Sequence, residues 1–458
     1  MGTSPTLYLL FRALLRACLS VFFRQIAVVG REHVPREGEG AVLFVGNHRN
    51  SLLDPALVVT HSGRIVHFAA ADVLFRVPLL APFLAGLGAV PIARRADHAD
   101  QAVDNSATFA ALHNVLASGR AVGIFPEGLS HEGAKLARLK TGAARVALGF
   151  AERHPGQRLR IVPVGLSYFH PKRFRSRVLL RFGPVLELDG ELVAAAADDP
   201  KEGARHLTGK IEAALRALTV NADDCGTIRV LDCVRRLYQP PGISLEDRVE
   251  LARRFNDIYP KVRELPEVRA LMQRVGAYQD RLDAAGLSDE DLRRKLRRSE
   301  APLRVLGHLV LVLGWGVLAL PGVLIHAPVF VMAKLAGAGA GLTSRRDVIA
   351  TTKMLAGLFV GLFVYSGATW LAFREAGFRG AAAAAVAIVL TGKACVRVFD
   401  RAAAFRRAGL TTVRLVMLGR EVRALVAERD ALERLVHAAV AQHRPAELVP
   451  LFGPAQLD

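Results

Sequence analysis

Long stretches without a charged residue most constrain what this chain can fold into. Residues 305–333 and 354–373 contain no Asp, Glu, Lys or Arg, and 380–392 form a third, shorter uncharged stretch. At about 1.5 Å of rise per residue, the first two are long enough to cross a hydrocarbon core of about 30 Å, whereas the third is marginal. Pro321 and Pro328 divide the first stretch, so a span followed by a bent or re-entrant piece fits it as well as one long helix does. The sequence therefore predicts an integral membrane protein.

The orientation of these stretches does not follow from charge counting. The segments before residue 305 and after 392 are basic, and so is the loop 334–353. Because all three flanks cannot face the same side unless one stretch fails to cross, the number of crossings stays open between two and three.

The N-terminal stretch 7–23 is apolar but is interrupted by Arg12 and Arg16. These residues are four apart and share one face of a helix, which predicts an amphipathic helix at the membrane interface and not a span. A cleaved signal peptide fits less well, because the charges lie inside the apolar run and no small-residue cleavage site follows.

The charge balance is strongly basic, with 61 Lys and Arg against 42 Asp and Glu and a net charge of +19. Such a balance fits nucleic acid, anionic lipid headgroups or phosphorylated ligands as partners. Residues 135–181 hold twelve of the basic side chains and a single acid, Glu152. We expect no nucleic-acid partner, because no recognised binding module accompanies the charge and the predicted spans restrict access.

The cysteines Cys18, Cys225, Cys233 and Cys395 are dispersed and form no CxxC motif. This disfavours a disulfide framework or a zinc site and favours a reducing compartment facing the cytosol. Because most of the basic residues are arginine, the composition also hints at a bacterial source, in which case the membrane is the inner membrane.

A different pattern runs from about residue 28 to 190, where short β-branched or aromatic runs alternate with helical stretches such as 101–117 and 136–152. Continuous apolar strands of this kind predict an α/β fold with a mostly parallel sheet covered by helices. The predicted strands are 41–45, 64–69, 121–125, 160–168 and 178–182.

These patterns divide the chain into five predicted regions. A helical extension follows the α/β domain and ends in a basic run, Arg293, Arg294, Lys295, Arg297 and Arg298. The predicted regions are a membrane-interface helix (1–27), the α/β domain (28–220), the helical extension (221–300), C-terminal transmembrane helices (301–396) and a helical tail (397–458).

The first motif with chemical potential follows the predicted strand 41–45 and reads GNHRNSLLDP from Gly46 to Pro55. A carboxylate on one ring nitrogen of His48 would let the other nitrogen act as a base. On a regular helix, residues six apart differ by about 240°, so His48 meets Asp54 only if the loop between them folds back. The residue before proline avoids the α region, which favours Asp54 as a helix N-cap. Taken alone, a surface histidine beside a helix cap explains the motif as well.

Three further motifs follow predicted strands, at the edge where open α/β sheets place their ligand sites. GAVPIARR ends in Arg94 and Arg95, and FPEGLSH (125–131) sets a glycine beside a carboxylate on a strand-to-helix turn, with Lys140 nearby. Backbone amides and basic side chains in such a turn suit an anion. VPVG (162–165) leads into YFHPKRFRSR. Each motif singly also fits a solvated charged loop.

In this order and spacing, His48…Asp54, GAVPIAR, FPEG with Ser130 and VPVG resemble the four blocks of the glycerolipid acyltransferase family, membrane enzymes that acylate glycerol 3-phosphate or lysophosphatidate. The resemblance covers about residues 28–190. That family usually has one residue fewer between the His and the Asp, and Leu129 replaces its small or hydroxylated residue after FPEG. The longer spacing, SYFHPKRFRSR, and the PG…APVFVMAK…RRDVIATTK region at 321–353 look like the fungal-type glycerol-3-phosphate/dihydroxyacetone-phosphate acyltransferase branch.

The resemblance implies roles for individual residues. His48 would remove the proton from the acceptor hydroxyl as this oxygen attacks the acyl thioester, with Asp54 orienting the ring and no acyl-enzyme intermediate. Arg94, the Glu127–Gly128 turn and Lys140 would hold the acceptor phosphate. Glu127 would orient Arg94 or a substrate hydroxyl, because its own charge repels phosphate. The remaining substrate-binding residues expected from the resemblance are Asn47 and Ser130.

The expected partners follow from the same resemblance. The donor is acyl-CoA or an acyl carrier protein, the acceptor is glycerol 3-phosphate or a related phosphorylated molecule, and the site lies at a phospholipid membrane with the catalytic domain facing the cytoplasm. No metal or bound cofactor is indicated.

Other functions stay open at this point. Acylation of lysophosphatidate uses the same chemistry, and a catalytically silent lipid-binding scaffold would keep the fold without the reaction. A transporter has less support, because the uncharged stretches are few and hold no carboxylate.

Overall fold

The computed structural model describes residues 4–94, 97, 104–133, 135–222, 224–293, 300–342 and 346–452. The chain divides into two compact units. We call Met1–Val220 with Gly337–Met354 the sheet unit, and Asn221–Ala336 with Leu355–Asp458 the helical unit.

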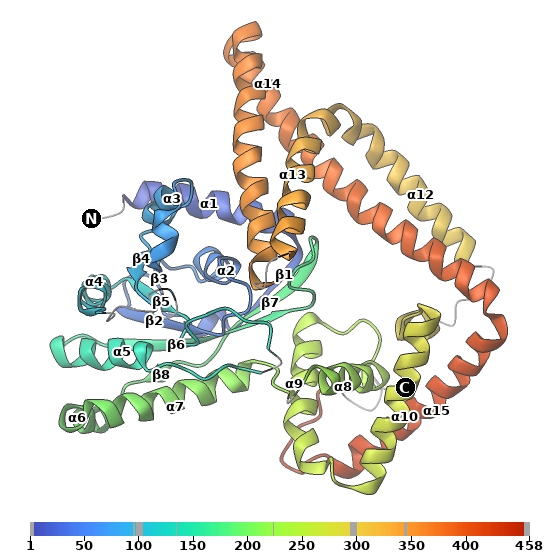
Figure 1. Ribbon diagram of the computed structural model, residues 1–458, viewed down its shortest axis with the longest axis horizontal. Helices are drawn as coiled ribbons and strands as arrows, with labels where there is room; N and C mark the ends of the chain where they lie inside the picture. Colours follow the sequence, from blue (N-terminus) through green and yellow to red (C-terminus); the bar gives the residue numbers. More distant parts are fainter. Residues whose placement is uncertain are drawn as a thin grey trace. The chain divides into compact units, whose positions relative to one another are not determined.

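The sheet unit is an α/β structure (Figure 1). Its helices are α1 (Pro5–Phe22), α2 (Leu53–His61), α3 (Ala81–Gly86), α4 (Ser106–Ala117), α5 (Gly142–Arg153), α6 (Gly190–Asp198) and α7 (Pro200–Leu218). Its strands are β1 (Phe23–Val29), β2 (Ala41–Gly46), β3 (Val66–Ala71), β4 (Val90–Ile92), β5 (Ala121–Ile124), β6 (Leu159–Tyr168), β7 (Ser176–Phe182) and β8 (Leu186–Glu187).

The strands form one sheet in the order β1-β7-β6-β2-β5-β3-β4, and β8 pairs with β6. Strand β2 runs parallel to both neighbours, β5 and β6, and every one of its residues is buried. Only β7 and β8 run antiparallel to β6. The mostly parallel sheet predicted from the apolar strands is therefore confirmed.

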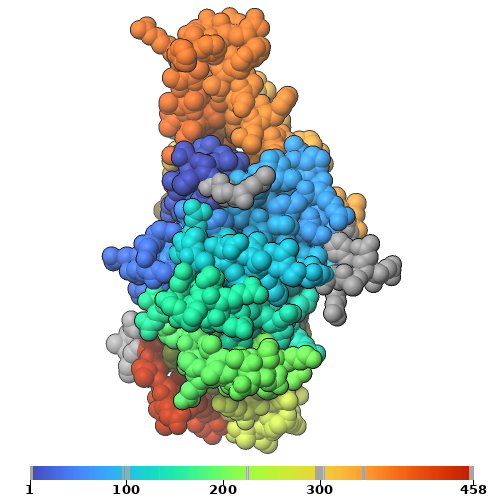
Figure 2. Space-filling model, turned by 90° about the vertical axis from the view of Figure 1, so that its left-hand side faces the viewer, coloured from blue at the N-terminus to red at the C-terminus, as the bar shows by residue number. Residues whose placement is uncertain are grey.

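Helices cover both faces of the sheet, which explains why the central strands β2 and β5 are apolar along their whole length. Figure 1 shows α5 and α7 on one face and α1 and α2 on the other. Side chains of β2, β5 and β6 form a hydrophobic core cluster with α4, α5, α6 and α7. In Figure 2, α6 and α7 form the green layer on the outside of this unit.

The elements differ from the predictions in several places, and the short strands β4 and β8 are not among the predicted ones. Strand β1 (Phe23–Val29) was missed, and it pairs in parallel with β7 at the sheet edge. Helix α5 begins at Gly142 and not at 136, because the preceding loop folds back onto the turn after β5: Lys140 donates its backbone N–H to the Pro126 carbonyl at 2.8 Å. Helix α4 begins at Ser106, and residues 101–103 of the predicted helix lie outside the described residues.

Helix α1 packs one apolar face on the sheet unit. Tyr8, Leu15, Leu19 and Phe22 are buried at helical spacing, and the Val66 amide donates to the Tyr8 hydroxyl at 2.8 Å. Other apolar side chains of α1, among them Leu10, are exposed. The helix therefore presents an apolar surface away from the core, as an interfacial helix does.

Most residues of the longest apolar helices belong to the helical unit. Val305–Gly341 and Arg346–Met417 are, with α1, long and apolar enough to cross a membrane. Large apolar side chains such as Leu324 and Phe363 are exposed on them. An exposed apolar surface of this extent indicates membrane association.

The helices after the sheet unit include the predicted extension and tail. They are α8 (Cys225–Tyr238), α9 (Leu245–Val262), α10 (Pro266–Ala285), α11 (Asp289–Arg293), α12 (Glu300–Ala319), α13 (Val323–Gly341), α14 (Ile349–Met417) and α15 (Gly419–His443). Helix α14 includes the third uncharged stretch and is interrupted by non-helical backbone at Ala376 and Gly377. Of the basic run, Arg293 is described, and Arg294, Lys295, Arg297 and Arg298 lie outside the described residues.

Candidate active site

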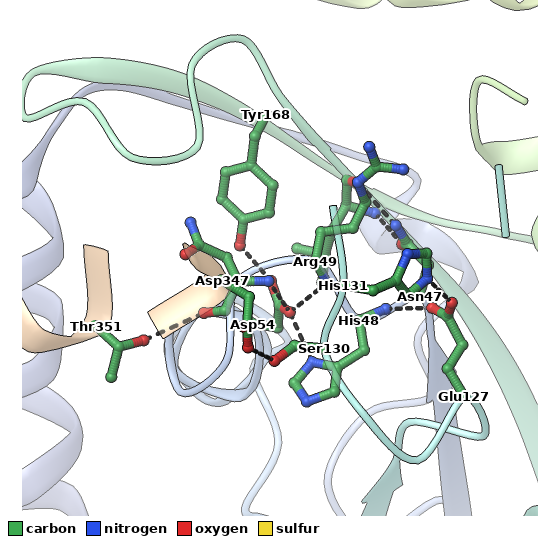
Figure 3. Close-up of polar contacts among 12 residues, drawn as sticks. Asn47, His48, Arg49, Asp54, Glu127, Ser130, His131, Tyr168, Asp347 and Thr351 are labelled. Carbon is green, nitrogen blue, oxygen red and sulfur yellow. Dashed lines mark hydrogen bonds and ion pairs between the residues drawn. The ribbon is translucent and has the colours of Figure 1, made fainter. Parts of the chain in front are cut away.

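The four sequence motifs meet at one edge of the sheet. Strands β2, β4, β5 and β6 belong to the parallel set, so the loops after them emerge at the same edge. Val45 pairs with Ile124, which brings the residues that follow each strand side by side. The site is drawn in Figure 3.

The loop between His48 and Asp54 folds back, and the two side chains meet. His48 Nδ1 lies 2.7 Å from Asp54 Oδ2. Ser51 makes the reversal possible with a φ of +44°, a left-handed conformation that is uncommon outside glycine. Helix α2 begins at Leu53, so Asp54 lies inside the first turn and is not the N-cap predicted from Pro55. A carboxylate in a first turn is also stabilised by the helix dipole.

Asp54 is fully buried and receives hydrogen bonds on both oxygens. The amides of Arg49 and Asn50 donate to Oδ2 at 2.8 and 2.7 Å, and the Tyr168 hydroxyl donates to Oδ1. Burial, together with the Asp54 charge, raises the pKa of Tyr168 well above its ordinary value. Tyr168 therefore stays a proton donor, and the carboxylate is held by donors from several directions.

The His48 ring is also fixed by stacking. It stacks on the Phe125 ring, with the two ring centroids 4.4 Å apart. The Phe125 ring also stacks with Phe68, and these centroids are 5.2 Å apart. The ring is 15% exposed. Because Nδ1 faces Asp54, Nε2 is directed to the opposite side of the ring, where a general base needs it.

Glu127 is turned inward beneath this loop. Its Oε1 accepts the backbone N–H of His48 at 2.6 Å, and its Oε2 accepts the N–H of Ala137 at 2.8 Å and pairs with His131 Nε2. His131 Nδ1 accepts the N–H of Gly133, so its proton lies on Nε2 and is donated to Glu127. Glu127 thus ties the FPEG turn to the His48 loop. Arg94, one of the two partners predicted for Glu127, has other hydrogen-bond partners, and the second candidate, a substrate hydroxyl, stays a prediction.

Arg94 is oriented by Asp97 instead. Its Nε donates to Asp97 Oδ2 at 2.6 Å, and its Nη1 points to the Gly128 carbonyl at 3.4 Å. Gly128 has a φ of +77°, and a Cβ there would lie 2.6 Å from Lys140 Nζ. Lys140 therefore crosses the glycine turn. The structure brings Arg94, Gly128 and Lys140 together as the sequence predicted, beside the turn that follows β5.

Asn47 and Ser130 differ in what they contact. The Asn47 amide is buried and bridges to β6, donating to the Leu166 carbonyl at 3.0 Å and accepting the Leu166 N–H at 2.7 Å. It therefore supports the loop from below, because its polar atoms are used by the backbone. The Ser130 hydroxyl donates to Asp347, far along the chain.

Several site residues were missed by the sequence reasoning. Tyr168 and His131 lie within the site motifs and could have been found there. Asp347 and Thr351 lie in RRDVIATTK, which the resemblance assigned to the C-terminal apolar region, and nothing in the sequence connects Asp97 with the site. Among the described residues, no three His, Cys, Asp or Glu side chains come together as a metal site requires.

Comparison with known proteins gives two family matches. The acyltransferase family model matches residues 25–167, and the model of the glycerol-3-phosphate acyltransferase 2 C-terminal domain matches residues 230–448. The first match contains the His48 and FPEG motifs, and the second contains the long apolar helices.

Individual relatives agree with these matches. Glycerol-3-phosphate O-acyltransferases 2 and 1 of Saccharomyces cerevisiae are each 32% identical to this chain, over 278 and 284 residues. Each alignment covers 57% of this chain and 37% of the yeast protein, so the aligned part spans well under half of the relatives' length. The crystal structure of the 1-acyl-sn-glycerophosphate acyltransferase of Thermotoga maritima aligns with a TM-score of 0.30 and 20% identity, over 44% of this chain and 79% of that one.

The two family matches cover successive parts of the chain, and both yeast relatives are named as glycerol-3-phosphate O-acyltransferases. Residues 25–167 thus match the acyltransferase family and residues 230–448 match the C-terminal domain of glycerol-3-phosphate acyltransferase 2, so the chain is similar to glycerol-3-phosphate acyltransferases over both parts.

Proposed function

We propose that this protein transfers an acyl chain from a thioester donor to a hydroxyl of glycerol 3-phosphate, as an early step in making phospholipid. The observation that carries the proposal is the pair of His48 and Asp54 at 2.7 Å, fixed at the same sheet edge as Arg94 and Lys140. A base and a cationic pocket side by side suit an acceptor that has both a hydroxyl and a phosphate. The yeast relatives named as glycerol-3-phosphate acyltransferases support the same substrate.

In the proposed reaction, His48 Nε2 takes the proton of the acceptor hydroxyl while the oxygen attacks the thioester carbonyl. Asp54 keeps the Nδ1 proton in place and stabilises the imidazolium that forms. When the tetrahedral intermediate collapses, the C–S bond breaks and the imidazolium returns its proton to the leaving thiolate. Ester and free thiol are the products, and the histidine ends neutral, ready for another turnover.

The acceptor phosphate is assigned to Arg94 and Lys140. A guanidinium held by Asp97 offers its remaining N–H groups in a fixed fork, which suits phosphate oxygens. Gly128 lets the Lys140 ammonium approach the turn, since a side chain there would occupy its place. Glu127 and Asn47 are assigned to holding the loops that carry these groups.

The donor and the setting extend the proposal. We assign acyl-CoA, or an acyl carrier protein, as donor on the resemblance to acyltransferases, and the long apolar helices would keep the enzyme at the membrane. The α/β domain, predicted from residue 28 to 220, would face the cytoplasm. It begins at strand β1 (Phe23), so the interface helix, predicted over 1–27, ends at Phe22. The helical extension 221–300, the transmembrane region 301–396 and the tail 397–458 would follow, anchoring the enzyme in the bacterial inner membrane if the source is bacterial.

The test is an acceptor panel with purified full-length protein and labelled acyl-CoA. We expect acylation of glycerol 3-phosphate, and we expect His48→Ala to abolish it while the protein stays folded and membrane-bound. Lysophosphatidate as the preferred acceptor would favour the alternative acyltransferase reaction. Full activity in His48→Ala would overturn the mechanism, and no activity on any acceptor in the wild type would favour a lipid-binding scaffold.

A further inference from the structure

A segment of the predicted transmembrane region (301–396) contacts the candidate active site. The 3-10 turn η5 (Arg346–Val348) and the start of α14 belong to the sheet unit. Asp347 Oδ2 accepts the hydroxyl proton of Ser130, which follows the FPEG turn. Thr351 Oγ1 donates to the carbonyl of Asn50, in the loop between His48 and Asp54, at 3.3 Å. The segment therefore contacts both loops that build the site.

A third contact holds the same segment in place. Lys353 Nζ donates to the carbonyl of Lys172 at 3.0 Å. The stem of Lys353 lies against Gly337 of α13, where a Cβ would come within 2.3 Å of Lys353 Cε. Asp347 and Thr351 are buried. The segment is thus packed against the site and not merely near it.

The direction of the Ser130 hydrogen bond limits what Ser130 can offer a substrate. A carboxylate only accepts hydrogen bonds, so the proton between Ser130 and Asp347 comes from the serine hydroxyl. With that proton committed, Ser130 Oγ has only lone pairs left for a third molecule. It can accept from a hydroxyl group, and it cannot donate to a carbonyl or a phosphate oxygen.

Ser130 lies beside the loop that carries His48. The next residue, His131, donates its backbone N–H to the His48 carbonyl at 3.2 Å. Figure 3 shows Ser130 between Asp347 and His48. The negative charge of Asp347 disfavours phosphate on this side, which leaves the phosphate to Arg94 and Lys140.

We propose that Ser130, held by Asp347, accepts a hydrogen bond from the second hydroxyl of the acceptor and so selects glycerol 3-phosphate over dihydroxyacetone phosphate. The two molecules share a phosphate and a hydroxyl that can be acylated, and they differ at the middle carbon, which carries a hydroxyl in one and a carbonyl oxygen in the other. The hydroxyl can donate to Ser130 Oγ. The carbonyl oxygen would face a second acceptor without a proton between them. Asp347 acts through Ser130 and is a positioning residue.

The proposal rests on the proposed acyltransferase function, and its test measures kcat/KM for both acceptors with full-length protein in phospholipid nanodiscs. We expect the wild type to prefer glycerol 3-phosphate. Ser130→Ala removes one neutral hydrogen bond and should lower the ratio of the two kcat/KM values roughly two- to tenfold, through the glycerol 3-phosphate value alone.

Asp347→Ala is the sharper variant, because it frees the Ser130 proton to turn toward the substrate. We expect this variant to raise kcat/KM for dihydroxyacetone phosphate and to have no further effect on the ratio when combined with Ser130→Ala. Asp347→Asn is the fallback if the alanine variant does not fold. The amide of the new asparagine can donate to Ser130 Oγ. The ratio of the two kcat/KM values should therefore change in the same direction as in Asp347→Ala, by a smaller factor.

Thr351→Val is the matched control. It lies in the same segment and loses its contact with Asn50 and not one with Ser130, so it should change both acceptors alike. An unchanged ratio in Ser130→Ala and in a folded Asp347 variant, with activity present, would overturn this inference and leave the acyltransferase function standing. Absence of wild-type activity on both acceptors would overturn the acyltransferase function itself.

Discussion

Asp54→Asn tests how the candidate base is controlled. The amides of Arg49 and Asn50 and the Nδ1–H of His48 all donate to Oδ2 of Asp54. In the variant, an amide oxygen must take this position, because an NH2 group there would face three donors. The NH2 group would then face the Tyr168 hydroxyl, which can turn to accept. We therefore expect the variant to keep the His48 tautomer and to lose only the negative charge.

The expected loss is the value of a charge-assisted hydrogen bond that forms as His48 becomes an imidazolium. Such bonds contribute about 1.5–3 kcal/mol, which corresponds to roughly ten- to a hundredfold in rate. The loss should appear in kcat, because Asp54 is buried beneath the ring and does not touch substrate. KM for the acceptor and for the donor should stay the same.

The assay is steady-state transfer from labelled acyl-CoA, with thermal unfolding in detergent as the control for folding. Adding Tyr168→Phe to Asp54→Asn removes the partner of the new NH2 group, so the amide orientation is weakened and the rate should fall further. A loss of about 10⁴-fold in Asp54→Asn alone, as expected when the tautomer is wrong, would refute the assigned amide orientation. An unchanged kcat would refute the role of Asp54.

Four further predictions concern the acceptor site, the loop, pH and the membrane. Arg94→Ala and Lys140→Ala should each raise the acceptor KM about ten- to a hundredfold without changing the donor KM. Unchanged acceptor kinetics in both variants would mean that these side chains only face solvent. Ser51→Gly should preserve activity and stability, whereas Ser51→Val should cost about 1–2 kcal/mol in unfolding free energy and displace Asp54; equal melting and activity of the two would contradict the left-handed turn. Burial lowers the pKa of His113 below 6.5. In the folded protein, the neutral ring of His113 donates to the Val146 carbonyl. Because the unfolded chain binds a proton on this ring more readily, the contribution of His113 to the free energy of unfolding should be fully present above about pH 6.5 and be lost as the pH falls below it. Thermal melts from pH 7.5 to 5.5 should show a shallower slope in His113→Gln, and an identical slope would contradict the assignment. Full-length protein should stay with membranes through high salt and carbonate, and release by salt alone would mean that the apolar helices are buried core.

The sequence by itself determined the elements and the edge at which they meet. Apolar runs without alternation predicted β2, β5 and β6, and their parallel direction predicted that the motifs after them would gather at one edge. The uncharged stretches predicted the long apolar helices in the same way. These features can be predicted from the sequence because each depends on residues that are adjacent in the chain or that repeat with a fixed period.

The tertiary structure alone decided how the site side chains pair. Whether His48 meets Asp54 depended on the left-handed Ser51, and where Glu127 points depended on the fold of the loop beyond it. The partner of Ser130 is Asp347, 217 positions along the chain, in the turn η5 before α14, within a stretch that the sequence analysis treated as a basic loop between apolar stretches. Contacts between distant segments are set by tertiary packing, and the local sequence pattern does not show them. For that reason the sequence predicted the base and the phosphate site, and only the fold showed which residue controls Ser130.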